Sequence, residues 1–375
     1  MKVHLFYVGV KMHIDNEIKL DFQDVLIRPK RSTLESRKQV SLERTFKTSH
    51  GAEFSGVPII AANMATGSFE MLNVFSKNKM FVAIAKYNNH LWKDYIMYPS
   101  VLNYGFYTIG MSDIEFEELK LIYKLISEKI GSSFAKDLKI CIDIANGYTQ
   151  RFASFVEKVR NEFSNNVIVV GNVATPEMVQ ELVIAGADYV KIGIGPGAMC
   201  STRKKSGVGY PQISAAIECS DAAHGLNAGI VLDGGMRVPG DIAKAFCANS
   251  DLVMIGGMFS GTDEQDGEII TKHYTSNELV WNDGNYSPLI IEKKFKAFYG
   301  MSSEYAQEKH SVGMKEYRTS EGIVEEIEYK GSVQNIIDDI LGGLRSAGTY
   351  IGANSIKNFG KCGTLIRCSR QHDKF

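Results

Sequence analysis

Short apolar runs alternate with amphipathic segments along most of the chain. The runs are rich in β-branched and aromatic residues, which favours strands. Eight such runs are present, over Val57–Ala62, Phe81–Ala85, Phe106–Ile109, Ile140–Ile144, Val167–Gly171, Tyr189–Ile192, Gly229–Leu232 and Leu252–Ile255. Helical periodicity between them predicts helices over Phe69–Lys77, Glu115–Lys129, Tyr148–Phe163, Pro176–Ala185, Ile213–Ala223 and Gly240–Ala248. Eight strands that alternate with helices predict an α/β protein with the (β/α)8 TIM-barrel fold.

A doubly wound open sheet is the alternative architecture. It would need fewer strands and a GxGxxG motif after the first strand, and the sequence shows neither. We therefore expect an N-terminal extension over 1–17 and one barrel domain over 18–375. The polar, Gly-rich segment at about 262–330 follows the eighth strand, where a mobile catalytic lid is expected. A final amphipathic helix is predicted over Ser332–Leu344, with Ser332 as its cap.

The overall charge is close to neutral, with 42 basic and 43 acidic residues among 375. No net field would attract nucleic acid or an anionic membrane, so neither partner is expected. The apolar runs are much shorter than the roughly 18 residues that a membrane-spanning helix needs, and no cleavage signal is evident. The sequence thus indicates a cytoplasmic protein.

One cysteine, Cys200, lies in a glycine-rich loop that runs from Gly193 to Gln212. The six cysteines form no CxxC pair, which argues against a zinc site and a disulfide framework. Cys200 follows a predicted strand and precedes a predicted helix, so we interpret it as a nucleophile rather than a buried filler. Thr202 could reach the same reacting atom or cap a helix. The carbonyls of Gly195, Gly197 and Cys200 could converge on a monovalent cation.

Further polar groups follow the predicted strands. Asp233-Gly234-Gly235 and Gly256-Gly257 end the seventh and eighth strands, where TIM barrels bind phosphate, and Asp233 could bind a ribose diol. Asp143 could orient a nicotinamide group or cap the helix from Tyr148. Lys86 places a cation at the same end of the barrel. These positions together predict a nucleotide site.

The segment after the eighth strand carries Glu321, Arg318 and Ser320. Glu321 could act as a general acid or base with Thr202, and Arg318 with Ser320 could bind a base edge or a phosphate. By composition alone the same residues would also suit a solvated loop.

The loop over 193–212 has the sequence Gly-Ile-Gly-Pro-Gly-Ala-Met-Cys-Ser-Thr-Arg-Lys-Lys-Ser-Gly-Val-Gly-Tyr-Pro-Gln. This loop resembles the active-site loop of the IMP dehydrogenase and GMP reductase family. Its Arg-Lys-Lys form resembles the reductase branch. The likeness covers roughly residues 18–358. It includes Leu20-Asp-Phe-Gln-Asp-Val-Leu-Ile-Arg-Pro-Lys-Arg-Ser, Val57-Pro-Ile-Ile-Ala-Ala-Asn-Met, Asp143-Ile-Ala-Asn-Gly-Tyr, Asp233-Gly-Gly, Phe298-Tyr-Gly-Met-Ser-Ser and Arg345-Ser-Ala-Gly-Thr-Tyr.

The resemblance implies an NADPH-dependent reductive deamination of GMP to IMP and ammonia. Cys200 would form a covalent thioimidate at C2 of the purine, and Thr202 with Glu321 would assist the departure of ammonia. A CBS-domain insertion after the second strand and a water-activating Arg-Tyr dyad, both typical of the dehydrogenases, are not evident in the sequence. A dehydrogenase without CBS domains and a non-catalytic purine-nucleotide-binding paralogue remain the alternatives.

The resemblance also implies the binding residues. The GMP site would comprise Asp233, Gly234, Gly235, Gly256, Gly257, Met301, Ser302, Arg318, Ser320 and Gly322. The NADPH site would comprise Lys86, Asp143, Ile194 and Gly195, with Ser36, Arg37, Ser346 and Thr349 reaching it across a subunit boundary. A potassium site at Gly195, Gly197, Cys200 and Arg203 and a homotetramer are implied as well.

Two stretches depart from the family pattern. After Asn63-Met64 the family usually continues Asp-Thr-Val-Gly-Thr-Phe, whereas this chain has Ala65-Thr-Gly-Ser-Phe. After the second strand the usual His-Lys-His-Tyr is replaced by Ala85-Lys-Tyr-Asn. Both changes are expected at the carboxyl end of the barrel, where the cofactor would bind.

Overall fold

The computed structural model describes residues 14–282, 285–300, 303 and 322–369. Within these residues, parallel strands form a closed eight-stranded barrel, which confirms the predicted fold class. Around the barrel the strands follow one another as β4 (Ile59–Ala61), β5 (Phe81–Ala83), β6 (Gly105–Ile109), β7 (Lys139–Asp143), β8 (Ile168–Val173), β9 (Tyr189–Ile192), β10 (Gly229–Asp233) and β11 (Leu252–Ile255). β11 pairs with β4 and closes the barrel.

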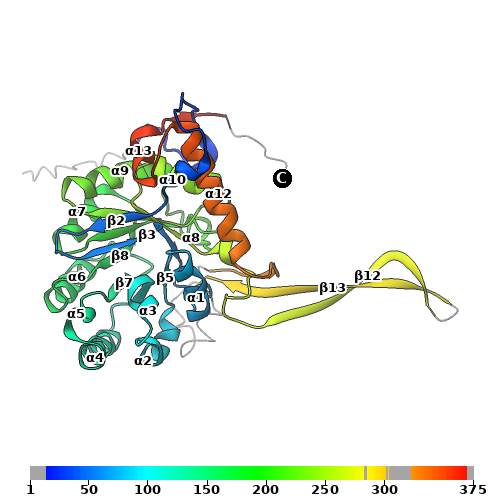
Figure 1. Cartoon of the computed structure of the whole chain (residues 1–375), viewed down its shortest axis with the longest axis horizontal. Coiled ribbons are helices and arrows are strands. Elements are labelled where there is room, and N and C mark those ends of the chain that lie inside the picture. Colours follow the sequence, from blue (N-terminus) through cyan, green and yellow to red (C-terminus); the bar gives the residue numbers. More distant parts are fainter. Residues whose placement is uncertain (1–13, 283–284, 301–302, 304–321, 370–375) are drawn as a thin grey trace, which may run out of the picture.

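The helices lie mainly outside the barrel (Figure 1). They are α1 (Phe69–Lys77), α2 (Trp92–Tyr95), α3 (Pro99–Tyr104), α4 (Asp113–Lys129), α5 (Ser132–Ala135), α6 (Gln150–Glu162), α7 (Pro176–Ile184), α8 (Thr202–Ser206), α9 (Gln212–Gly225), α10 (Pro239–Cys247), α12 (Gln334–Ile351) and α13 (Phe359–Cys362). Pro176 and Pro239 each occupy the first turn, as expected from their fixed φ. The helix predicted to end at Leu344 continues to Ile351.

Strand side chains divide between two apolar layers. Residues such as Ile59 pack outward against the helices, whereas Ile60, Phe106 and Met254 fill the inside of the barrel. This alternation follows from the period of two along a strand. Each fully buried large apolar side chain contributes about 1.5–3 kcal/mol relative to exposure, so the two layers hold the strand ends in place.

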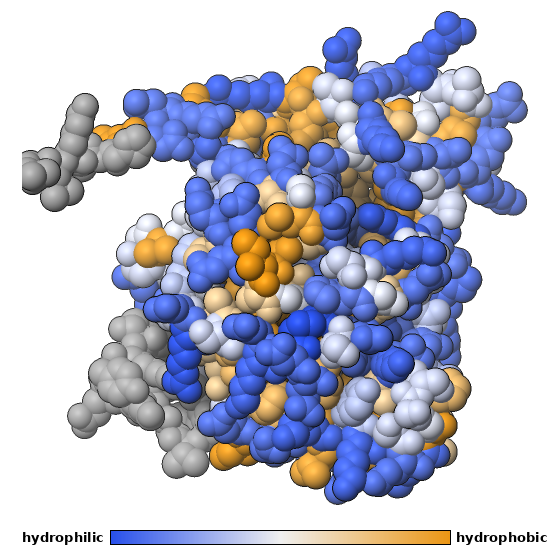
Figure 2. All heavy atoms as spheres, turned by 90° about the vertical axis from the view of Figure 1, so that its left-hand side faces the viewer, coloured by the Kyte–Doolittle hydropathy of each residue, from blue (hydrophilic) through white to orange (hydrophobic). Residues whose placement is uncertain are grey.

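A short hairpin closes the amino end of the barrel. Its strands are β2 (Arg44–Lys47) and β3 (Glu53–Gly56), and Phe46 stacks on Phe54 with 4.7 Å between ring centroids. Phe54 also meets the ring of Tyr189 at the start of β9. The outer surface of this face is mainly hydrophilic with some hydrophobic patches (Figure 2), and both phenylalanines are buried in the inner layer. The two phenylalanines therefore close the inner apolar layer at this end of the barrel.

The segment predicted as a lid contains a long hairpin. β12 (Ile269–Asn282) and β13 (Asn285–Tyr299) project far from the barrel (Figure 1), and β14 (Val324–Glu328) pairs with the base of β13. Two further strands, β1 (Val25–Ile27) and β15 (Leu365–Arg367), pair with each other. The sequence pattern did not predict any of these strands. Whether the segment moves as a lid, and whether 1–17 is an extension, stay predictions.

Candidate active site

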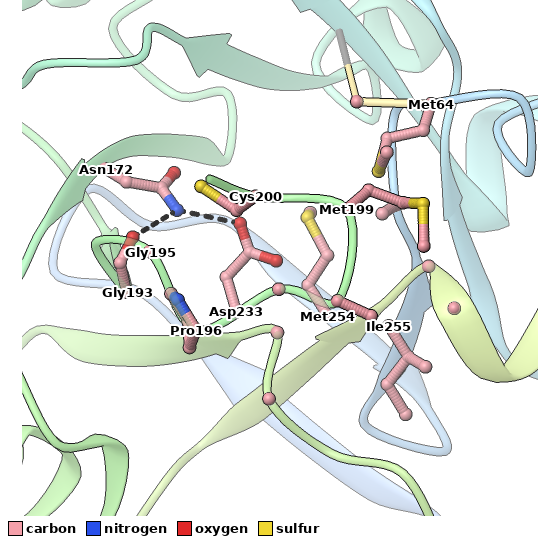
Figure 3. Close-up of a pocket in the computed structure, with 18 of the residues that line it drawn as sticks. Met64, Asn172, Gly193, Gly195, Pro196, Met199, Cys200, Asp233, Met254 and Ile255 are labelled. Carbon is pink, nitrogen blue, oxygen red and sulfur yellow. Dashed lines mark hydrogen bonds between the residues drawn. The ribbon is translucent and has the colours of Figure 1, made fainter. Parts of the chain in front are cut away.

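A pocket of about 260 Å³ opens at the carboxyl ends of the barrel strands. Its wall includes the ends of β7, β8, β10 and β11 and the loop after β9. Figure 3 shows Cys200, Asp233 and Asn172 on one side and the thioethers of Met64, Met199 and Met254 on the other. A polar edge facing a polarisable apolar wall suits a flat heterocycle with hydrogen-bonding groups on its rim.

The loop between β9 and α8 presents Cys200 to this pocket. Gly193 and Gly195 have φ of 152° and 76°, values that glycine adopts readily. The Cys200 amide donates to the Gly197 carbonyl at 3.0 Å, and the Met199 carbonyl accepts the Ile323 amide at 3.1 Å. The Cys200 thiol donates to Thr202 Oγ1 at 3.2 Å. The predicted pair of Cys200 and Thr202 is therefore brought together in the pocket.

The remaining cysteines differ from Cys200 in their surroundings. All six are free, and Cys141, Cys219 and Cys247 are buried. Burial raises the pKa of the Cys141 thiol to about 11 and those of Cys219 and Cys247 to about 12. Because a thiolate is the reactive form, these thiols are inert at neutral pH. Only Cys200 lines the pocket.

The two Gly-Gly turns lie at neighbouring strand ends, as predicted. Gly234 and Gly235 have φ of 80° and 84°, and Gly256 and Gly257 line the same pocket. Gln212 Nε2 donates to the Asp233 carbonyl at 3.0 Å, which ties the start of α9 to the end of β10. The backbone thus approaches the pocket closely without side chains, a requirement for phosphate binding by main-chain amides.

A buried lysine, Lys191, organises the acidic groups under the pocket. Its ammonium forms an ion pair with Asp143 and lies 3.8 Å from Asp233 Oδ2. Burial disfavours the charged carboxylate of Asp143, but Lys191 and Lys86 outweigh it and lower its pKa to about 2. Burial raises the pKa of Asp233, although Lys191 opposes the rise. The pKa of Lys191 is raised because the carboxylates outweigh its burial.

Sequence reasoning missed Lys191. The available signal was a lysine in the otherwise apolar run Tyr-Val-Lys-Ile, which the structure shows fully buried. A buried lysine is rare unless it is paired, so its position alone pointed to a carboxylate partner. Asp143 does not cap α6, because Thr149 precedes that helix and Asp143 pairs with Lys191.

The residues predicted for the cofactor fall into two groups. Asp143, Ile194 and Gly195 line the pocket, and Lys86 reaches its edge by donating to the Asp143 carbonyl at 2.9 Å. Ser36 and Arg37 lie in a segment that packs along α12, which also carries Ser346 and Thr349. These four residues are not among those that line the pocket.

The side-chain oxygen of Asn172 shows whether the site fits a ligand that carries an amide. The Asn172 amide nitrogen donates to the Gly193 carbonyl at 3.0 Å and to Asp233 Oδ2 at 2.8 Å. Its oxygen is buried and has no hydrogen-bond partner among the described residues. Because a buried acceptor without a partner is costly, a ligand N–H donor, such as a carboxamide, fits there.

The candidate ligands for a potassium ion in this loop are oxygen atoms of the backbone. No group of three or more His, Cys, Asp or Glu side chains suits a metal within the described ranges. The Arg203 side chain donates to the carbonyls of Ile194 and Tyr210 and pairs with Asp21. Arg203 could therefore contribute only its own carbonyl, and its guanidinium instead fixes the loop.

Several predicted residues lie outside the described part of the chain. They are Met301, Ser302, Arg318, Ser320 and Glu321, and their placement in the site stays a prediction. Gly322, by contrast, is described and forms a β-bridge with Cys200.

Comparison with known proteins gives consistent matches over nearly the whole chain. A family described as the IMP dehydrogenase / GMP reductase domain matches residues 135–373. GMP reductase 2 of Mus musculus is 48% identical over 363 residues, which cover 96% of this chain and 97% of the relative. GMP reductase of Yersinia enterocolitica is 47% identical over 369 residues, with 97% and 99% covered. Separately, none of the helices in the described ranges is long and apolar enough to span a membrane.

Proposed function

The chain belongs to the IMP dehydrogenase / GMP reductase family, and we propose that it is the enzyme that converts GMP to IMP and ammonia with NADPH. The observation that carries this proposal is the pairing of Cys200 with Thr202 in a pocket between phosphate-type glycine turns and a methionine wall. The identity of nearly half of all positions to GMP reductases from a mammal and a bacterium supports the same activity.

Cys200 begins the reaction by adding its sulfur to C2 of the guanine ring. The exocyclic amine takes up a proton and leaves as ammonia, so that C2 remains bound to sulfur as a thioimidate. Bound NADPH supplies the hydride for C2. The C–S bond then breaks, Cys200 returns to its starting form, and IMP is released. Covalent capture thus divides one difficult substitution into two easier steps.

The other residues of the chain position the substrate and move the proton. Thr202 Oγ1, which accepts the Cys200 thiol at 3.2 Å, would carry the proton to the amine together with Glu321. Main-chain amides at Gly234, Gly235, Gly256 and Gly257 would hold the phosphate, and Asp233 the ribose. Lys86, Asp143, Ile194 and Gly195 would hold the cofactor, with the free oxygen of Asn172 receiving its carboxamide.

The assembly and its location are part of the same proposal. The protein would form a homotetramer. The residues Ser36, Arg37, Ser346 and Thr349, which are grouped around α12 and do not line the pocket, would reach the cofactor of a neighbouring subunit. The six free cysteines are in keeping with a reducing compartment, so we assign the enzyme to the cytoplasm.

Purified protein mixed with GMP and NADPH is expected to consume NADPH and to form IMP and ammonia in equal amounts. The loss of nicotinamide absorbance measures the rate, and chromatography identifies IMP. Oxidation of IMP with NAD⁺ but no turnover of GMP would instead indicate a dehydrogenase without CBS domains. Binding of GMP without hydride transfer would indicate a non-catalytic paralogue.

Potassium is expected to raise this rate. Carbonyl oxygens of Gly195, Gly197 and Cys200 would bind the ion and hold Cys200 in its reactive position, with Arg203 supporting the loop. Replacing potassium by sodium at constant ionic strength should lower kcat several-fold and leave the thermal midpoint unchanged. Equal rates in the two salts would contradict a potassium site.

A further inference from the structure

The carboxylate of Asp266 lies against the two residues that follow Lys86. Asp266 Oδ2 accepts the Asn88 side-chain amide at 2.7 Å and the Tyr87 hydroxyl at 3.1 Å. The backbone amide of Asp266 donates to the Ala65 carbonyl at 2.8 Å. One residue of the segment after β11 therefore contacts both stretches in which the sequence departs from the family pattern.

The backbone around Asp266 is fixed on two sides. Ser68 Oγ donates to the Glu264 carbonyl at 2.5 Å, which joins the segment to the start of α1. Lys296 Nζ donates to the Gln265 carbonyl at 2.7 Å, and Gln265 Nε2 donates to the Ala297 carbonyl at 2.8 Å, which join it to the base of β13. Because Gln265 and Lys296 are buried, the position of Asp266 is set before any ligand binds.

The charges around Asp266 keep these hydrogen bonds in one arrangement. Burial raises the pKa of Asp266, and the nearby charge of Glu70 adds to this rise. The hydrogen bonds from Asn88 and Tyr87 and the charge of Lys296 oppose it. Burial, followed by Asp266 and Tyr299, raises the pKa of Tyr87, so its hydroxyl stays a donor. A carboxylate that accepts two donors is a stronger anchor than a neutral group would be.

The anchored residues determine where Lys86 lies. The 3₁₀ helix Lys86–Leu91, which follows β5 after Ile84 and Ala85, begins with Lys86, Tyr87 and Asn88. With Tyr87 and Asn88 tied to Asp266, the backbone of Lys86 is held while its ammonium donates to the Asp143 carbonyl at 2.9 Å. Without that tie, the short helix would have fewer contacts to resist rotation.

We propose that Asp266 is a positioning residue that holds Lys86 at the cofactor site through Tyr87 and Asn88. It supplies, from the segment after β11, the carboxylate that the family pattern has directly after Asn63-Met64. The departures at Ala65, Tyr87 and Asn88 are then parts of one exchange of partners rather than separate losses. This inference rests on the proposed function.

Asp266→Ala tests the proposal, with Glu268→Gln as a matched control from an exposed position in the same segment. Loss of a charge-assisted hydrogen bond to a binding group is expected to raise the KM for NADPH about tenfold. The dissociation constant of GMP, measured without NADPH, should change less than twofold, and Glu268→Gln should match the parent. A KM within twofold of the parent would overturn the proposal, as would equal losses for GMP and NADPH.

A double-mutant cycle separates positioning from general destabilisation. Asn88→Ala alone should also raise the KM for NADPH, and adding it to Asp266→Ala should produce little further change, because both remove the same contact. Independent, multiplying effects would overturn the proposal. Hydrogen exchange at the amides of residues 86–91 should be faster in Asp266→Ala, and unchanged exchange there would also overturn it. Because hydrogen exchange needs no turnover, it tests the positioning role of Asp266 even if the parent fails to reduce GMP.

Discussion

Replacing Cys200 with alanine is expected to lower GMP turnover by about 10⁴-fold or more. The covalent route needs a sulfur at this position, and Thr202 at 3.2 Å cannot replace it because its hydroxyl is a much weaker nucleophile. The glycine turns and the methionine wall are unchanged in this variant, so the affinity for GMP should stay within about threefold. NADPH oxidation measures the first quantity, and calorimetric titration with GMP measures the second.

Cys368→Ser provides the control for this experiment. Cys368 is partly exposed, follows β15 and does not line the pocket. Its replacement should leave both the rate and the GMP affinity unchanged. Retention of more than about a tenth of the parent rate by Cys200→Ala would rule out Cys200 as the covalent residue.

Replacing Lys191 with methionine should lower the free energy of unfolding by about 3–5 kcal/mol, the usual cost of removing one partner of a buried ion pair. The variant leaves the carboxylates of Asp143 and Asp233 together without a buried cation. The loss should therefore be largest near neutral pH. In the parent, Asp143 has a pKa of about 2, below its ordinary 3.8, so its stabilising contribution is present above pH 3.8 and lost as the pH falls through 2.

The stability of Lys191→Met should depend on pH in the opposite direction to that of the parent: its free energy of unfolding should rise as the pH falls. Without Lys191 the buried Asp143 carboxyl gains a pKa above its ordinary value, so protonation favours the folded state. The difference in stability between parent and variant should thus narrow as the pH falls from 7 to 4. Denaturant unfolding at a series of pH values measures it, with the exposed Lys93→Met as control. Adding Asp143→Asn should recover part of the loss, and no recovery would contradict a direct pairing.

The barrel could be predicted from sequence because strands that are buried on both faces read as continuous apolar runs. The strands at Val167–Gly171 and Tyr189–Ile192 lie within two residues of the observed β8 and β9. The long hairpin could not be predicted in this way. Both faces of β12 and β13 meet solvent over much of their length, so polar and apolar residues show no steady alternation.

The parts of the candidate site that could be predicted from sequence are those that a short local pattern indicates by itself. Glycine pairs at strand ends and a cysteine in a glycine loop have local meaning, and the structure brings Gly235, Gly256 and Cys200 to one pocket. Lys191 and Asp266 act through partners distant in sequence, Asp143 and Asn88. No local pattern marks a contact between residues 88 and 266, since the fold alone brings them together.

Phe46 and Phe54 join the apolar side chains that fill the barrel, so in the described residues the pocket with Cys200 opens at the carboxyl ends of the strands. Purine nucleotide and dinucleotide must both enter past the ends of the strands, and three products must leave by the same route. Because Cys200 lines this pocket, the purine bound to it and the cofactor would share one opening. We therefore expect the two ligands to bind and to leave in a fixed order rather than at random.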